Sequence, residues 1–368
     1  MSVKIIHTAD LHLGRALPYL NARAAARRSE IALTLQKITD ICKTENADAL
    51  VIAGDLFESP CPEDDIAAQV FSILGNAGLP VIICAGNHDC LLCDSPYFTK
   101  KLPDNVTVLT KDVPFVKIKE DAAVYGASFY DYEMLMSAPP ALPDNNSINI
   151  LALHADIATA SRYNPINADF LAQSGADYAA LGHIHNRSEL KCAGSTYYAY
   201  CGCPEGQGFD ELSVCGIYSV TVGKGSCTAE FIPTCRRIHA FERIDISDCE
   251  DNIQICNTVA EQLKAKYGED YSDNLYKIHL TGCQSFKPDT TFIAEHLSQS
   301  VYYIKVRNKA QANINLELLA KEPTLKGIFV RRMLEKLSTC ADSERGLVNQ
   351  ALTLGLAAFD GEVGFDED

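Results

Sequence analysis

Carboxylate, amide and imidazole side chains occur repeatedly where short apolar segments of this sequence end. The clearest example is the stretch AALGHIHNR, in which His183 and His185 follow an apolar run and are separated by one residue. Alternate residues of a strand point to the same side, so both imidazoles can face one place. Similar endings occur in ADLHLG, AGDLFE, AGNHD and LALHAD. The polar residues at all these ends are Asp10, His12, Asp55, Asn87, His88, Asp89, His154, His183 and His185.

The apolar segments themselves have the pattern of buried strands that alternate with helices. Residues 3–9, 47–54 and 80–87 predict strands, and the segments 22–44 and 62–78 between them have helical periodicity. The pattern is then hairpin-like over 106–126, strand-like over 148–156 and 176–185, and β-rich over 197–233. In an open α/β sheet the carboxyl ends of the strands line one crevice. We therefore expect an α/β fold in which the polar residues converge at one edge.

Each of these residues has an ordinary structural explanation when it is considered alone. A single buried histidine is usually hydrogen-bonded in the core, and an aspartate after glycine usually belongs to a turn. Together, however, so many ionisable groups in one crevice would carry a large cost of desolvation and repulsion, which bound metal ions remove. Mixed imidazole and carboxylate ligands favour Mn, Fe or Zn over Ca. One zinc ion takes about four protein ligands or fewer, so we predict two divalent metal ions, with Mn, Fe and Zn as the candidates.

A site with two ions suits the hydrolysis of phosphate esters. Two neighbouring ions hold both the attacking and the leaving oxygen of a phosphoryl displacement. The sequence contains no G-x-x-x-x-G-K-[ST] loop and no Ser-His-Asp order that would indicate another mechanism. Hydrolysis by metal-activated water is therefore the simplest chemistry for these residues.

The composition is typical of a soluble globular protein with two or three domains. The chain has 368 residues, is 47% hydrophobic and carries a formal net charge of −16. No run of about 18 apolar residues predicts a membrane span, and MSVKIIHTADLHLG has no signal-peptide pattern, which favours a cytoplasmic location. The acidic balance disfavours coating of DNA by charge alone. It permits a phosphate that is held through metal ions, because a cation cluster reverses the local field.

Two further groups of residues receive ordinary structural interpretations. The 15 cysteines are expected to be free thiols that behave as small apolar residues. Cys90 and Cys93 form a C-x-x-C pair without a second pair at zinc-finger spacing, which disfavours a structural zinc site. Arg23, Arg27 and Arg28 lie on one helical segment, and a solvated helix face is the preferred explanation for them.

The pattern changes near Arg236, where a second region begins. Strand, helix, strand, helix and strand patterns follow at 241–247, 251–268, 275–282, 288–300 and 301–307. This order predicts a compact α+β (βαβαβ) domain.

The last part of the chain has two helical patterns, at 325–340 and 343–359. The final residues, FDGEVGFDED, form an acidic tail that is expected to fray. We therefore predict domains at 1–235, 236–310 and 311–368.

The five blocks DLH, GDLF, GNHD, LH and GHIH, in this order, resemble the calcineurin-like metallophosphoesterase superfamily over residues 3–233. The resemblance implies a four-layer α/β/β/α sandwich, with two mixed sheets flanked by helices, in place of a simple open sheet. HTADLHLG, GDLFE and ALGHIHNR followed by YAYCGCP resemble the SbcD-type DNA repair exonuclease subunits, and GCPEGQGFDELSVCG is similar to YhaO-like bacterial relatives. The βαβαβ unit then corresponds to the smaller C-terminal DNA-capping domain of that branch.

The resemblance also implies a role for each strand-end residue. One ion would be held by Asp10, His12, Asp55 and His185, and the other by Asp55, Asn87, His154 and His183, so that Asp55 bridges the two. His88 would not be a ligand. It would lie beside the scissile phosphate and stabilise charge or protonate the leaving oxygen, a task that suits a pKa near neutral pH. Asp89 would either orient a ligand or belong to a turn.

Two residues depart from the family pattern. Glu58 stands where some relatives have a histidine that helps exonuclease action, which leaves the metal ligands intact but bears on processive exonuclease activity. Cys203 replaces the usual serine after Y-x-G, and we expect little effect from it.

The leading functional prediction is a metal-dependent phosphodiesterase, a DNA exo- or endonuclease that is the nuclease subunit of an SbcCD-like repair complex. Members of that branch form homodimers and work with a coiled-coil SbcC-like ATPase. This chain has neither a Walker motif nor heptads, so the ATPase would be a separate protein. The alternative is a metallophosphatase for a small-molecule or protein phosphoester, which the acidic charge favours. A non-enzymatic scaffold would have lost a ligand or His88, and none of these residues is missing.

Overall fold

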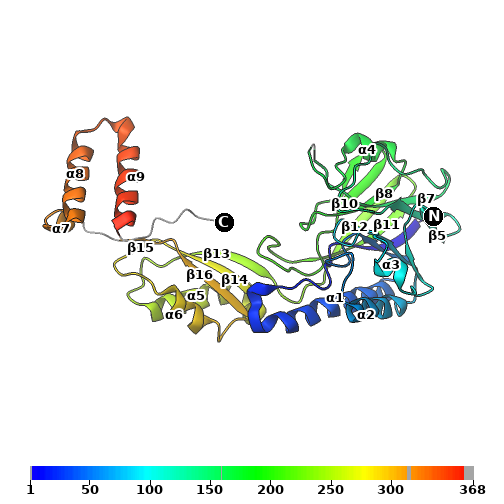
Figure 1. The fold of residues 1–368 in the computed structure, drawn as a ribbon, viewed down its shortest axis with the longest axis horizontal. Helices are drawn as coiled ribbons and strands as arrows, with labels where there is room; N and C mark the ends of the chain where they lie inside the picture. The colour runs from blue at the N-terminus through cyan, green and yellow to red at the C-terminus, as the bar shows by residue number, and fades with distance from the viewer. Residues whose placement is uncertain (1, 159, 313–315, 360–368) are drawn as a thin grey trace. The chain divides into compact units, whose positions relative to one another are not determined.

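The computed structural model describes residues 2–158, 160–312 and 316–359. Two six-stranded mixed sheets occupy its N-terminal part (Figure 1). The first sheet has the order β12-β11-β1-β2-β3-β4, in which β1 to β4 are parallel and β11 is antiparallel to both β1 and β12. Its strands are β1 Ser2–Thr8, β2 Ala49–Ala53, β3 Val81–Cys84, β4 Val106–Val108, β11 Gly216–Gly223 and β12 Ser226–Pro233.

The second sheet has the order β5-β6-β7-β8-β10-β9. The central strands β6, β7, β8 and β10 are parallel, and the edge strands β5 and β9 are antiparallel to their neighbours. The strands are β5 Phe115–Lys119, β6 Ala122–Ala127, β7 Ile148–His154, β8 Tyr178–Gly182, β9 Lys191–Ala193 and β10 Thr196–Tyr200. The segment 106–126, predicted to be hairpin-like, therefore divides: β4 ends the first sheet, and the β5–β6 pair opens the second.

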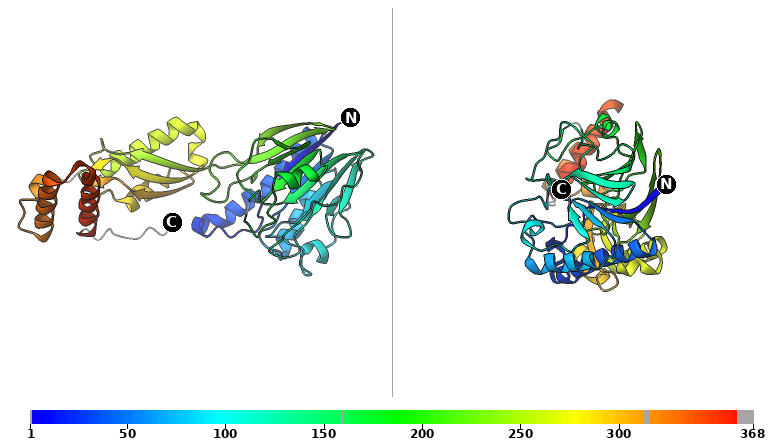
Figure 2. Two further views of the ribbon diagram at one scale, coloured as in Figure 1. Left: turned by 90° about the horizontal axis from the view of Figure 1, so that it is seen from above. Right: turned by 90° about the vertical axis from the view of Figure 1, so that its right-hand side faces the viewer.

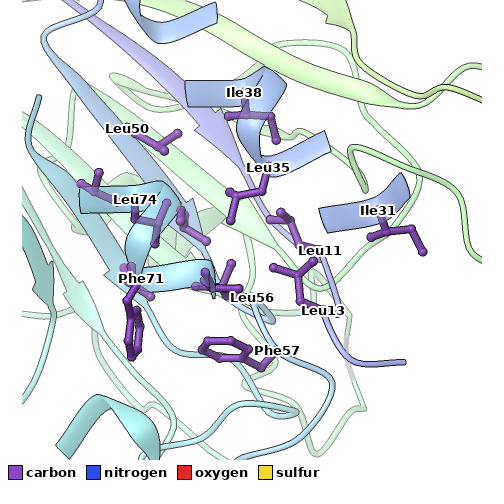
Figure 3. Packing of buried hydrophobic residues seen from close by; sticks show 14 of the residues in the cluster. Leu11, Leu13, Ile31, Leu35, Ile38, Leu50, Leu56, Phe57, Phe71 and Leu74 are labelled. Atoms are coloured by element: carbon purple, nitrogen blue, oxygen red, sulfur yellow. The ribbon is translucent and has the colours of Figure 1, made fainter. Parts of the chain in front are cut away.

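Helices cover the outer faces of the two sheets. Helices α1 (Ala24–Thr44) and α2 (Asp64–Gly75) lie side by side on the first sheet, as the right-hand view of Figure 2 shows. They bury residues such as Leu35, Ile38 and Leu74 against Leu50 (Figure 3). Helix α4 (Ala168–Gln173) packs on the second sheet through a separate apolar cluster. Two short elements, η1 (Pro18–Arg23) and α3 (Pro96–Thr99), complete this part.

A third apolar cluster fills the space between the sheets. Val51 and Ile82 of the first sheet pack in it with Ile150 and Ala180 of the second. Each strand in the middle of a sheet therefore has apolar residues on both faces, which explains the unbroken apolar runs in the sequence. The layers follow the order helix, sheet, sheet, helix, so the predicted four-layer α/β/β/α class is confirmed.

The second region has the predicted βαβαβ order around a three-stranded sheet, β13-β14-β16. Helices α8 and α9 follow and pack on each other through Val330, Leu352 and Leu356. The elements are β13 His239–Asp245, α5 Asn252–Tyr267, η2 Gly268–Asp273, β14 Leu275–Thr281, β15 Cys283–Gln284, α6 Thr290–Leu297, β16 Tyr303–Asn308, β17 Gln311–Ala312, α7 Leu316–Leu319, α8 Leu325–Thr339 and α9 Asp342–Phe359.

The described chain forms two compact units. One contains both six-stranded sheets, the other contains α8 and α9, and residues of the βαβαβ region belong to both. The boundaries at 235 and 310 remain predictions. Residues 360–368, which include most of the acidic tail predicted to fray, lie outside the described residues. Among the described helices, none is long and apolar enough to cross a membrane.

One charged residue of α1 is not where the sequence pattern placed it. The solvated face predicted for Arg23, Arg27 and Arg28 is wrong for Arg27, whose side chain is 0% exposed. Its guanidinium donates to Glu205 at 2.5 Å, to the carbonyl of Gly206 at 2.8 Å and to Glu30 at 3.1 Å. Helical periodicity could not reveal this, because the covering loop lies almost half the chain away in the sequence.

Replacement of Arg27 by methionine is expected to destabilise the protein by about 3–5 kcal/mol, because it leaves the buried Glu205 carboxylate without the guanidinium that balances its charge. The change in unfolding free energy is measured by urea denaturation. The matched control is Arg28→Met, since Arg28 is exposed and its guanidinium donates to the carbonyl of Ala16 at 3.0 Å. Similar losses in both variants would contradict a structural role for the Arg27–Glu205 pair.

Candidate metal centre

The strand-end residues of both sheets lie together. Asp10 and His12 follow β1, Asp55 follows β2, His154 ends β7, and His183 and His185 follow β8. Within the described part of the chain, ligand atoms of three groups each lie within 4.8 Å of one another. The groups are Asp10 with His12 and His185, His12 with Asp55 and His88, and Asp10 with Asp55 and His154. The parallel strands of each sheet direct their carboxyl ends to the same edge, so the prediction that these residues converge is met by the geometry.

Four of the residues have a left-handed backbone conformation. The φ angle is 55° at Asp10, 45° at His12, 51° at Asp55 and 97° at His183. For a residue other than glycine, such a conformation costs about 1–3 kcal/mol and persists where the surroundings impose it. The amides of Asp10 and His12 donate to the carbonyls of Gly54 and Asp55, both at 3.0 Å. The turns after β1 and β2 therefore hold each other in this form.

In the first group, two imidazole nitrogens face each other. The Nε2 atoms of His12 and His185 are 3.1 Å apart, with the carboxylate of Asp10 close to both. Burial alone would lower the pKa of His185, but Glu211 and Asp10 raise it to about 9. Two such nitrogens need a cation between them, either a proton or a metal ion. Because imidazole and carboxylate are ligands of transition-metal ions, this donor set fits a divalent ion.

The second group is arranged around the fully buried His154. Its Nδ1 donates to the carbonyl of Ala53 at 3.1 Å, so its Nε2 faces Asn87 Oδ1 at 2.9 Å and Asp55 Oδ2 at 3.3 Å. Burial lowers the pKa of His154, but Asp55 and Asp10 outweigh that effect and raise it to about 9. A nitrogen that faces two oxygen acceptors again requires a cation, and a divalent ion fits it in place of a proton.

Asp55 lies between the two groups. Its Oδ2 is 3.3 Å from His154 Nε2 and 3.7 Å from His12 Nε2, and its Oδ1 accepts from the amide of His88 at 2.9 Å. Burial favours the neutral acid, yet the nearby His154 and His12 hold the pKa of Asp55 below its usual range. The carboxylate is therefore ionised and faces both groups.

His183 is placed differently from the other histidines. Its amide donates to the carboxylate of Asp10 at 3.1 Å, and its ring lies 5.1 Å from the ring of His154 and 5.2 Å from that of Tyr163. Burial and the charge of His154 lower the pKa of His183 to about 4. Its ring is therefore neutral and can offer a nitrogen lone pair to a metal ion. Among the described residues, it belongs to none of the three groups above.

His88 lies at the accessible margin of the cluster. Its side chain is 43% exposed, and its ring packs edge-on at 4.7 Å from the ring of His12. Its Nδ1 is 3.2 Å from the carbonyl oxygen of Glu58. A proton on Nδ1 donates to that carbonyl, which leaves Nε2 free for a group from solution.

Asp89, for which two roles were open, organises the loops that carry the other residues. Its carboxylate accepts from the amides of Leu56 at 2.9 Å and Gly86 at 2.7 Å and from the hydroxyl of Tyr97 at 2.7 Å. The loop after β2 is thereby joined to the loop after β3. Burial and the nearby charge of Asp55 raise the pKa of Asp89.

Two residues close to the cluster carry roles that the sequence did not reveal. Glu211 is buried and lies 2.5 Å from His185 Nδ1. Glu58, noted only as a departure from the family pattern, lies 2.8 Å from His12 Nδ1. Glu211 lies in the stretch GFDEL, which has no motif that would mark it as important. Only the folded loop shows that its carboxylate lies beside His185.

The fold and the cluster together define a class of protein. Two mixed sheets with helices on their outer faces present carboxylates and imidazoles at converging strand ends, and this donor set is compatible with divalent metal ions. Such a site fits the chemistry of hydrolases that use metal ions.

Comparison with known proteins identifies the family. Residues 3–187 match the sequence profile described as "Calcineurin-like phosphoesterase". The chain is 30% identical over 246 residues to "Uncharacterized metallophosphoesterase YhaO" of Bacillus subtilis, covering 61% of this chain and 59% of that protein. It is 28% identical over 252 residues to "DNA double-strand break repair protein Mre11" of Sulfurisphaera tokodaii, covering 64% and 62%. It is 27% identical over 311 residues to the SbcD component of the SbcCD nuclease of Staphylococcus saprophyticus, covering 73% and 77%.

The chain belongs to the calcineurin-like phosphoesterase family, as its motifs predicted. The family binds two divalent metal ions, and the Asp/His cluster of this chain is compatible with them. The chain spans about three fifths of the YhaO and Mre11 relatives that it matches.

Replacement of Gly86 by alanine is expected to reduce metal binding. A Cβ atom there would lie 2.2 Å from Asp55 Oδ1 and 2.8 Å from the Asp55 amide, so the carboxylate between the two groups must move. Metal content after dialysis against Mn²⁺ is measured by mass spectrometry and is expected to fall by about one ion per chain or more. The control is Gly346→Ala in α9, where a Cβ would meet nothing within 4 Å. Wild-type metal content in Gly86→Ala would contradict the expected displacement of Asp55.

Proposed function

We propose that this chain is a metal-dependent DNA phosphodiesterase, an exo- or endonuclease, and the nuclease subunit of an SbcCD-like repair complex. The match to the SbcD component of the SbcCD nuclease carries the proposal. It covers 73% of the chain, which is more than residues 1–235 comprise, and therefore reaches into the βαβαβ region. A phosphatase that used the metal cluster alone would not need similarity there.

The proposed ligands follow the two halves of the cluster. One ion is held by Asp10, His12, Asp55 and His185, and the other by Asp55, Asn87, His154 and His183, with Asp55 shared. The contacts of Asp55 with both His12 and His154 support the shared position. The ring of His183, beside that of His154, supports its assignment to the second ion.

When bound, two divalent ions, Mn²⁺ in this proposal and Fe or Zn as alternatives, supply Lewis acidity and a water of lowered pKa. The side chains of Asp55 and His88 have the following roles. Asp55 keeps its negative charge at the centre because His154 and His12 stabilise it. His88 presents Nε2 to the substrate phosphate, since its Nδ1 is used by the Glu58 carbonyl, and it stabilises charge or protonates the leaving oxygen.

The proposal includes DNA as substrate, a homodimer, a separate coiled-coil SbcC-like ATPase and a cytoplasmic location. The DNA substrate, the homodimer and the ATPase follow from the family resemblance. The DNA is recognised by the βαβαβ region in its role as a capping domain, since a chain with a net charge of −16 lacks the overall positive field that holds DNA without a dedicated surface.

A metallophosphatase that acts on a small-molecule or protein phosphoester is the second candidate. The same two ions serve monoesters and diesters, and the charge of −16 favours a substrate less anionic than DNA. The two candidates are distinguished by incubating the Mn²⁺-loaded chain, with and without its ATPase partner, with DNA and with a phosphate monoester. Release of nucleotides supports the nuclease, whereas intact DNA together with released inorganic phosphate supports the phosphatase.

His88→Ala is expected to lower hydrolysis by about 10²–10⁴-fold, because it removes the group that stabilises charge or transfers a proton at the phosphate. Its metal content is expected to equal that of the wild type, whereas Asp55→Ala is expected to lose both metal and activity. Hydrolysis and metal content are measured on the same preparations. His296→Ala is the control, since His296 is exposed on α6. Hydrolysis that survives both changes would contradict the mechanism.

A further inference from the structure

We infer that Glu58 and Glu211 are a matched pair of positioning residues, which orient His12 and His185 so that both present Nε2 to one metal ion. The inference rests on the proposed metal site and extends it to residues outside the ligand set. It assigns a role to Glu58, which stands where some members of the family have a histidine.

A glutamate carboxylate lies against Nδ1 of each histidine, as a hydrogen-bond partner of His185 and as an ion-pair partner of His12. Glu58 Oε2 lies 2.8 Å from His12 Nδ1, and Glu211 Oε1 lies 2.5 Å from His185 Nδ1. Glu211 accepts a hydrogen bond from His185 Nδ1, and the negative charge of Glu58 beside His12 Nδ1 favours a proton on that nitrogen as well. When a metal ion replaces the proton between them, each Nε2 can then present a lone pair, and the two Nε2 atoms face each other at 3.1 Å. Two lone pairs at this distance repel unless a cation lies against them, so the carboxylates create a site for a metal ion.

The two carboxylates differ in how firmly they are held. Glu211 is 1% exposed, and its second oxygen accepts from the amides of Gln207 and Gly208. Glu58 is 31% exposed, but its Oε2 and His12 Nδ1 are both buried, and among the described residues neither atom has a hydrogen-bond partner, because their own contact at 2.8 Å is an ion pair without hydrogen-bond alignment. Glu211 is therefore a rigid support, and Glu58 is an adjustable one whose Oε2 is available to His12.

Arg15 balances the charge of the pair. Its Nε is 3.9 Å from Glu58 Oε1, and its Nη1 is 3.9 Å from Glu211 Oε1. These distances are too long for hydrogen bonds, so Arg15 offsets the charge of both carboxylates without displacing either histidine from them. Arg15 therefore lowers the electrostatic cost of keeping two carboxylates, Glu58 and Glu211, beside the ligand histidines His12 and His185.

Glu58→Gln and Glu211→Gln test this inference through metal affinity. Loss of such a partner typically weakens metal binding by about 10–100-fold. Titration with Mn²⁺ is followed by calorimetry and by electron paramagnetic resonance, which separates a spin-coupled ion pair from a single ion. We expect each variant to lose affinity by about 10–100-fold for one of two ions, and to change the other by less than about threefold. The signal of the pair should then give way to that of a single ion at limiting Mn²⁺.

The matched control is Glu189→Gln, because Glu189 is an exposed carboxylate close to His185 in the sequence. Urea denaturation accompanies each titration. If the buried Glu211→Gln variant does not fold, the half-exposed Glu58→Gln variant decides alone. The inference is overturned if Glu58→Gln binds both ions like the wild type, if it weakens both equally, or if the wild-type chain binds fewer than two ions.

Failure of the proposed function would appear in a different measurement. A wild-type chain that binds two Mn²⁺ ions but leaves every DNA substrate intact would contradict the nuclease proposal. A selective loss of one ion in Glu58→Gln would still support the pair of carboxylates in that case. The metal titration of the variants therefore tests the role of the two carboxylates, and the DNA assay tests the proposed nuclease activity.

Discussion

The structure depends on how buried charge is balanced where strand ends of the two sheets meet. Asp10, Asp55 and His154 are almost completely buried, and their ligand atoms lie within 4.8 Å of one another. Burial penalises every charged form there. Opposite charges compensate: the histidines keep Asp55 ionised, and the carboxylates hold His154 and His185 in the charged form when no ion is bound. A bound divalent ion would replace those protons, which is why the same arrangement fits metal.

The surrounding structure supports this arrangement through close packing of backbone. A Cβ at Gly54 would lie 2.1 Å from His154 Nδ1, and one at Gly182 would lie 2.0 Å from the carbonyl of Ala53. Asp89 joins the loops after β2 and β3 through hydrogen bonds to their amides. The glycines therefore let the loops approach, and Asp89 then holds them in register. The left-handed residues of the cluster follow from the same crowding.

One loop connects the cluster to the helical layer. Residues 203–215 carry Glu205, which binds the buried Arg27 of α1, and Glu211, which faces His185. In the same loop, Gln207 donates to the carbonyl of Leu11 at 2.6 Å. Support for His185 is thus anchored to both the first helix and the turn after β1. A buried cluster that holds several like charges requires this kind of rigid support to keep its groups in place.

The sequence by itself determined the α/β class, the four layers through the family resemblance, and the set of polar residues at the strand ends. These features follow from local periodicity and from glycines that mark where strands stop, and neither depends on distant contacts. Only the tertiary structure decided which nitrogen of His12 and His185 faces the centre, that Asp89 joins two loops, and that Arg27 is buried. Each of these outcomes arises from pairs far apart in the chain, such as Arg27 with Glu205, whose approach no local pattern encodes. The contacts of Glu211 with His185 and of Glu58 with His12 were also decided only by the tertiary structure, because folding places each loop carboxylate beside its imidazole.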